Sequence, residues 1–214
     1  MAMALRVVVP PHPLLNHWLM LLRDPQTPVP LYGTAMAELG RWLSYEALRD
    51  WIPTREMSVQ FGMKVVSGQV IDASVPLLAV VAVPESLGLW QGGQQVLPAA
   101  QLGTLCCSAG TLSHVTLPNA IPERCGVLLY WSALAEPEPL LAVLDHLASL
   151  GVHGQRLRLI TAVAAAPALH SIGEVHEALT IYTAAIDPDL DVSGGISPGI
   201  GAVAERLLGF SHSP

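Results

Sequence analysis

The spacing of apolar residues changes along this chain, and the change separates two regions. In residues 12–24 and 28–49, apolar positions recur every three or four residues, which is the pattern of helices with one buried face. Residues 57–70 instead alternate apolar and polar positions, with glycines at 62 and 68, which favours short strands or a hairpin. The N-terminal part is therefore expected to be helical and then hairpin-forming.

From residue 75 onward, continuous apolar runs alternate with helical patterns. The run over 77–83 is rich in valine and alanine, as expected of a strand that is buried on both faces. Further strands are predicted over 100–107, 126–131, 156–163 and 179–184, and helices over 139–150 and 170–178. Residues 87–96 carry weak helix signals, and 108–124 look irregular. This βαβαβ order predicts an α/β fold whose mostly parallel central sheet is flanked by helices.

Composition narrows the partners that this chain can have. Its 214 residues suit a single domain over 1–214, with 51% hydrophobic and only 13% charged residues. The net charge of −7, with ten lysines and arginines, argues against nucleic acid or an anionic membrane as the main partner. So little charge is instead typical of a chain that buries surface in an oligomer or against a protein partner.

The remaining compositional signals concern redox state, membranes and metals. Cys106, Cys107 and Cys125 are odd in number and form no C-x-x-C pair, so a disulfide framework is not expected. No apolar run approaches the length of a bilayer-spanning helix, and residues 1–6 lack a secretory pattern. The eight histidines lack metal-ligand spacing. We therefore expect a cytoplasmic protein without a resident metal.

Four motifs in order resemble one family, the uracil phosphoribosyltransferases, over about residues 7–210. They are His12-Pro-Leu followed by Leu22-Arg-Asp24, Leu43-Ser-Tyr-Glu-Ala47, Tyr182-Thr-Ala-Ala-Ile-Asp187 and Pro198-Gly-Ile-Gly201. The resemblance implies a type I phosphoribosyltransferase fold and a homodimer. It also implies transfer of ribose 5-phosphate from phosphoribosyl pyrophosphate to uracil with Mg²⁺. On this resemblance, a nucleobase would meet Ile196, Gly201, Ala202 and Val203.

The positions that would hold the donor depart from the family pattern. A polyanionic donor needs cations and backbone amides around its phosphates. Where the family has two arginines, this chain has Glu85 and Cys106, and both glycines of the family's phosphate loop are missing. The substituted loop consists of Tyr130, Trp131, Ser132, Ala133, Leu134, Ala135, Glu136, Pro137 and Glu138. Its acids would repel a phosphate, and its proline has no amide hydrogen to donate.

These substitutions leave three functional hypotheses. The first is a catalytically silent family member that acts as a dimeric scaffold or regulatory subunit, with no catalytic residue and no cofactor. The second is a pyrimidine sensor that reads a base through the backbone of the C-terminal loop. The third is an active uracil phosphoribosyltransferase with altered donor contacts, which alone would need Mg²⁺ and phosphoribosyl pyrophosphate. The sequence favours the first.

Overall fold

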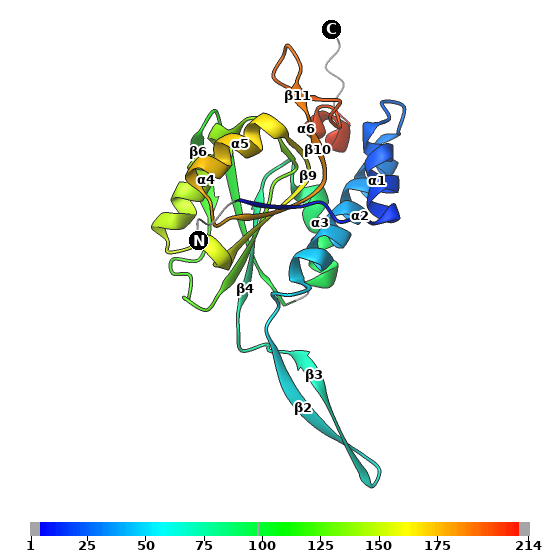
Figure 1. The fold of residues 1–214 in the computed structure, drawn as a ribbon, viewed down its shortest axis with the longest axis vertical. Helices are drawn as coiled ribbons and strands as arrows, with labels where there is room; N and C mark the ends of the chain where they lie inside the picture. The colour runs from blue at the N-terminus through cyan, green and yellow to red at the C-terminus, as the bar shows by residue number, and fades with distance from the viewer. Residues whose placement is uncertain (1–4, 98, 210–214) are drawn as a thin grey trace.

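The computed structural model describes residues 5–97 and 99–209, and it confirms the expected α/β architecture (Figure 1). Within these residues the central sheet runs in the order β1-β10-β9-β7-β4-β5-β6, with the short β8 paired to β9. Its strands are β1 Arg6–Val8, β4 Leu77–Ala82, β5 Gln101–Ser108, β6 Thr111–Thr116, β7 Gly126–Tyr130, β8 Ala133–Leu134, β9 Leu157–Ala165 and β10 Thr180–Asp187. Every pairing is parallel except that of β5 with β6.

Helices cover both faces of the sheet. On one side lie α1 Pro13–Arg23, α2 Val29–Leu48, α3 Leu87–Val96 and α6 Val203–Leu208, and on the other lie α4 Pro137–Ser149 and α5 Ala166–Val175. Strand β7 divides its side chains between them: Leu128 and Tyr130 enter the first core, whereas Val127 and Leu129 enter the second. Because both faces are covered, all five β7 residues are buried, as the continuous apolar runs predict.

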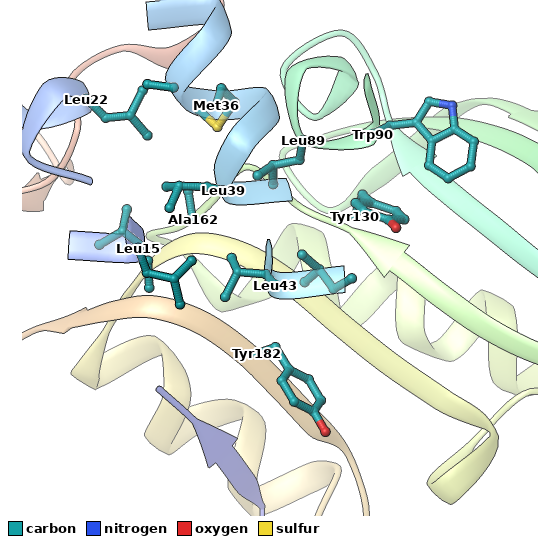
Figure 2. Close-up of a cluster of buried hydrophobic side chains, with 14 of the residues drawn as sticks. Leu15, Leu22, Met36, Leu39, Leu43, Leu89, Trp90, Tyr130, Ala162 and Tyr182 are labelled. Atoms are coloured by element: carbon teal, nitrogen blue, oxygen red, sulfur yellow. The ribbon is translucent and has the colours of Figure 1, made fainter. Parts of the chain in front are cut away.

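Figure 2 shows the first core, where apolar side chains of α1, α2 and α3 meet the sheet. The labelled residues are Leu15, Leu22, Met36, Leu39, Leu43, Leu89, Trp90, Tyr130, Ala162 and Tyr182. The Trp90 and Tyr130 rings meet edge to face with centroids 5.4 Å apart. This core fixes the helices over the sheet. Hydrogen bonds from Arg23 of α1 and Tyr32 of α2 also hold the loop that follows β10.

A two-stranded hairpin, separate from the central sheet, projects from this body (Figure 1). Strands β2 Thr54–Phe61 and β3 Lys64–Ile71 form the expected antiparallel hairpin, and every residue of β2 is exposed. Between β10 and α6, the small pair β11 Asp189–Leu190 and β12 Ile196–Ser197 closes a loop, and a 3₁₀ turn, Gly154–Arg156, precedes β9. The expectation of an N-terminal helical and hairpin region is confirmed.

The structure corrects four local assignments. Residues 108–124, expected to be irregular, contain β6, which pairs with β5 through a turn at Ala109 and Gly110. The weak pattern over 87–96 is a full helix, α3, and the helix expected over 170–178 begins earlier, at Ala166. The short edge strand β1 was not predicted. The expectations for residues 1–4, and residue 210 at the end of the family resemblance, lie outside the described part of the chain.

Helices α2 and α3 approach each other through glycines. A Cβ atom built on Gly92 would lie 1.6 Å from the Ala37 carbonyl oxygen, and one on Gly40 would lie 1.9 Å from the Leu89 carbonyl oxygen. The two backbones are therefore in direct contact, and a methyl group there must push the helices apart.

We accordingly expect Gly92→Ala to lower the free energy of unfolding by about 1–3 kcal/mol, as overpacking does in well-packed cores. The matched control is Gly33→Ala, also on a helix, where nothing lies within 4 Å of the new Cβ. That change should stabilise the protein by up to about 1 kcal/mol through helix propensity. Urea denaturation measures the free energy of unfolding of both variants. If Gly92→Ala stabilised the protein as Gly33→Ala does, the close contact between the helices would be contradicted.

Candidate functional site

A cavity of about 550 Å³ lies beyond the carboxyl ends of the central strands. This edge is where parallel α/β sheets bind their ligands. The cavity is bounded by the segments that follow β4 and β7 and by the loop between β10 and α6. Its walls are Ala82, Val83, Glu85, Ser86, Cys107, Trp131, Ser132, Ala133, Ala135, Pro139, Asp191, Ser193, Gly195, Ile196, Pro198, Ile200, Gly201, Ala202 and Val203. A second cavity, of about 580 Å³, lies at the opposite edge and contains none of the predicted site residues.

The four residues predicted to meet a nucleobase come together here. Ile196, Gly201, Ala202 and Val203 all line the cavity, although β12 and α6 supply the first and the last of them. They share the loop that the sequence motif Pro198-Gly-Ile-Gly201 marks. Their contact with a base remains a prediction.

The predicted donor positions divide into two groups. Glu85, Trp131, Ser132, Ala133 and Ala135 line the cavity. The others, Cys106, Tyr130, Leu134, Glu136, Pro137 and Glu138, do not. On β8 the alternation of side chains places Ala133 at the cavity and Leu134 in the core, and the last three residues begin or precede α4.

Tyr130 is an example of a predicted site residue that belongs to the core. Its side chain is fully buried, and its hydroxyl lies 2.8 Å from Ser44 Oγ. Leu134 is likewise buried, under α4. On β5 the thiol at the cavity is that of Cys107 rather than Cys106, and it donates to the Pro139 carbonyl at 3.3 Å. Burial raises the pKa of Cys107, so this thiol stays protonated and is a poor nucleophile.

Hydrogen bonds hold the cavity wall in place on the β4 and β7 side. The Ser132 amide donates to Ser86 Oγ at 2.9 Å, and both residues are buried. This bond joins the segment after β4 to the segment after β7. The hydroxyl oxygen of Ser86 thus helps to hold the cavity wall by accepting from the Ser132 amide.

A buried ion pair anchors the opposite wall. Asp187, at the end of β10, is 3% exposed and accepts from Arg23 Nη1 and Nη2 at 2.9 and 2.6 Å. The same carboxylate accepts from the Gly199 amide at 2.8 Å, and Arg23 donates to the Gly199 carbonyl at 3.1 Å. Both residues occur in family motifs, yet the sequence did not reveal that they hold each other and the loop.

The charged side chains that line the cavity are carboxylates. Within the described part of the chain they are Glu85 and Asp191, and the lining contains no lysine, arginine or histidine. Hydrogen bonds from Ser193 and from the Gly195 amide hold the pKa of Asp191 below its usual range. This wall is therefore anionic at neutral pH.

The donor set determines how a magnesium ion could fit. Across residues 5–97 and 99–209 no group of three or more His, Cys, Asp or Glu side chains could hold a metal ion. Magnesium, however, is usually bound by one or two carboxylates together with substrate phosphates. Among the described residues of the wall the carboxylates are Glu85 and Asp191, so a magnesium ion here would be held mainly by the phosphates of a bound diphosphate. No helix within the described residues is long and apolar enough to cross a bilayer.

The mostly parallel sheet and the cavity at its carboxyl edge define an α/β protein of the class that binds ligands at the ends of its strands, and comparison with known proteins identifies the family. The family model for uracil phosphoribosyltransferase matches residues 9–209. The uracil phosphoribosyltransferase of Synechococcus elongatus is 42% identical, covering 98% of this chain and 99% of the relative. That of Nicotiana tabacum is 36% identical, covering 95% and 93%.

This protein therefore belongs to the uracil phosphoribosyltransferase family. The solved structure of the AQ2163 protein from Aquifex aeolicus has the same fold, with a TM-score of 0.85 and 24% identity. It covers 97% of this chain, and this chain covers all of it.

The expectation of a catalytically silent scaffold is wrong. Relatives that are 36–42% identical over nearly the whole chain are named uracil phosphoribosyltransferases, which supports an active enzyme. Substituted side chains at the donor positions are therefore no sign of an inactive protein. Six of those eleven positions lie outside the cavity wall, so the identity of these six residues says little about the cavity itself.

Proposed function

We propose that this protein is a uracil phosphoribosyltransferase with altered donor contacts. It would transfer ribose 5-phosphate from phosphoribosyl pyrophosphate to uracil and release UMP and pyrophosphate. The observation that carries the proposal is the 42% identity, end to end, with the enzyme of Synechococcus elongatus. The cavity is consistent with it, because it brings the predicted base-binding loop beside the segments that follow β4 and β7.

In the proposed reaction a bond forms between N1 of uracil and C1′ of the ribose while the bond from C1′ to pyrophosphate breaks. The proton of N1 is released to solvent. The chain contributes mainly by holding both reactants in line, which alone lowers a bimolecular barrier substantially. The loop containing Gly201 and Ala202 would orient the base, and Ser132 and Ala133 would face the donor.

The charges of the cavity predict how the donor is held. With Glu85 and Asp191 in the wall, the negative charge of the diphosphate must be balanced by the magnesium that accompanies it. We therefore propose that the enzyme takes the magnesium complex of phosphoribosyl pyrophosphate and binds free donor poorly.

The test is direct formation of UMP. Purified protein is incubated with radiolabelled uracil, phosphoribosyl pyrophosphate and excess Mg²⁺, and products are separated by chromatography. We expect labelled UMP from uracil, and no labelled nucleotide when radiolabelled cytosine or hypoxanthine replaces uracil. Absence of UMP at millimolar donor and magnesium would contradict the proposal.

We also propose that two copies of this chain form a homodimer through the hairpin. The side chains of Phe61 and Met63 are 79% and 100% exposed at its tip, where a monomer would leave them in water. The double substitution Phe61→Ser with Met63→Ser should shift the mass measured by light scattering from dimer toward monomer. Val192→Ser, at an equally exposed apolar residue elsewhere, is the control and should leave the mass unchanged. A variant that stays dimeric would exclude the hairpin tip.

The cellular location is a further part of the proposal. Cys106, Cys107 and Cys125 are free thiols, which supports a reducing compartment such as the cytoplasm.

A further inference from the structure

The carbonyl oxygen of Ile200 receives two hydrogen bonds from opposite ends of the chain. The hydroxyl of Tyr32, on α2, donates to it at 3.2 Å, and Arg206 Nη1, on α6, donates at 3.1 Å. Tyr32 is fully buried, and burial raises its pKa to about 12. The phenol therefore keeps its proton and acts as a donor throughout the neutral range.

Arg206 is itself held firmly. Its guanidinium also donates to the carbonyl oxygens of Leu22 and Asp24 at the end of α1, the latter at 2.7 Å. It lies over the ring of Tyr32 with its Cζ 4.1 Å from the centroid. A cation at this helix end is also favoured by the helix dipole. The two donors on the Ile200 carbonyl thus form one rigid unit with α1 and α2.

This arrangement fixes the direction of the next amide. The peptide bond between Ile200 and Gly201 is trans, so its N–H points away from its C=O. Because the carbonyl points toward Tyr32 and Arg206, the Gly201 N–H points to the opposite side. In residues 5–97 and 99–209 no hydrogen-bond acceptor for this amide is found, and Gly201 lines the cavity.

Gly201 also permits the close approach of Arg206. Its φ of +77° is a conformation that other residues rarely adopt, and a Cβ there would lie 3.0 Å from Arg206 Cδ. Glycine at this position thus lets the guanidinium reach the Ile200 carbonyl.

We propose that Tyr32 and Arg206 are positioning residues that present the Gly201 amide to a ring carbonyl oxygen of the pyrimidine base. Two donors on one carbonyl, one of them charged, also polarise the peptide and strengthen its N–H as a donor. The inference rests on the proposed function, since it assigns the base to this loop. Neither side chain lines the cavity, so both act through the peptide that they hold.

The test compares variants by calorimetric binding of uracil and of UMP, and by steady-state kinetics with each substrate varied. Tyr32→Phe keeps the ring under the guanidinium and removes only the hydroxyl. It should raise the Kd and KM for uracil about three- to tenfold, as the loss of one buried hydrogen bond does. Arg206→Met should raise them further, and Arg206→Lys should restore part of the affinity. The KM for the donor should not change.

A matched control variant removes a comparable tyrosine hydroxyl that lies far from the loop. Tyr182 is also buried, and its hydroxyl accepts from Arg158 Nη1 at 2.9 Å near the start of β10, whereas this loop follows the end of that strand. Tyr182→Phe should cost a similar loss of stability and leave uracil binding unchanged. A purely structural role for Tyr32 would give the two variants the same profile.

The outcomes separate this inference from the proposed function. If the unmodified protein binds uracil or UMP without turnover, the proposed function fails and the binding comparison still tests the inference. If Tyr32→Phe and Arg206→Met bind uracil as the unmodified protein does, the inference is overturned while the enzyme proposal stands. If the unmodified protein binds neither uracil nor UMP, both are overturned.

Discussion

Asp187→Ala is expected to lower the free energy of unfolding by about 3–5 kcal/mol, the range measured when one partner of a buried ion pair is removed. The Arg23 side chain is only 17% exposed, so its charge would remain buried without a counter-charge. The Gly199 amide would lose its acceptor at the same time. Urea denaturation followed by fluorescence measures the loss directly.

The control for this prediction is Asp50→Ala. Asp50 pairs with Arg158 at 2.9 Å, but its side chain is 54% exposed. Arg158 would also keep its hydrogen bonds to the Ala47 carbonyl and the Tyr182 hydroxyl. Arg158 is itself only 10% exposed, so removing Asp50 should cost about 1–3 kcal/mol, still less than Asp187→Ala, because water can reach the place of the Asp50 carboxylate. Equal losses of stability in Asp187→Ala and Asp50→Ala would contradict a larger contribution from the Arg23–Asp187 pair.

Asp187→Ala should also impair base binding. Without the carboxylate, the loop loses its bond to Gly199, and the peptides that follow are held from one side only. In the surviving folded protein we expect the KM for uracil to rise more than the KM for the donor. Kinetics measured well below the unfolding transition would separate this effect from lost stability.

Glu85→Arg is expected to lower the KM for magnesium phosphoribosyl pyrophosphate about ten- to hundredfold. Two unit charges about 7 Å apart at an effective dielectric constant of 20 interact by roughly 2 kcal/mol, reversing one of them doubles this, and screening by water and salt in the open cavity roughly halves it again, which leaves a ten- to hundredfold effect. Glu85 lies in the cavity wall directly after β4, so its charge acts on any diphosphate bound there. Steady-state UMP formation at fixed free Mg²⁺ measures the KM, and Glu85→Gln should give an intermediate value.

Glu174→Arg is the control, because it makes the same change in net charge at the opposite edge of the sheet. It should leave the KM for the donor unchanged. If both variants lower this KM equally, the effect is one of overall charge. If neither does, the donor does not bind beside Glu85.

The sheet could be predicted from the sequence because its signal is local. The buried run over 77–83 and the βαβαβ pattern after residue 126 follow from the period of apolar residues alone. Strand β6 was missed because it is a polar edge strand with most of its residues exposed, so it lacks that period. Helix α3 was weakly signalled because Gly88, Gly92 and Gly93 lower its intrinsic propensity. Its stability comes from packing against α2, which no local pattern records.

The candidate site was predictable only in part, for a similar reason. Motif spacing located Ile196 and Gly201 at the cavity, since strand ends meet at one edge. Motifs could not separate Trp131, which faces the cavity, from Tyr130, which faces the core. The contacts of Tyr32 and Arg206 with Ile200 depend on tertiary structure. A tyrosine at a buried helical position and an arginine after the glycine loop were the available signals.

The tie between Arg206 and α1 has a consequence for biosynthesis. The bond from Arg206 to the Leu22 carbonyl joins residues 184 positions apart, and the bond from Tyr32 to Ile200 joins residues 168 apart. Contacts at such separation form late, because the intervening chain must first be ordered. On the ribosome, α1, α2 and most of the sheet emerge before Arg206 has been translated. We therefore expect the loop between β10 and α6 to take its final position only at the last step of folding, so that the proposed recognition of a base is completed only then.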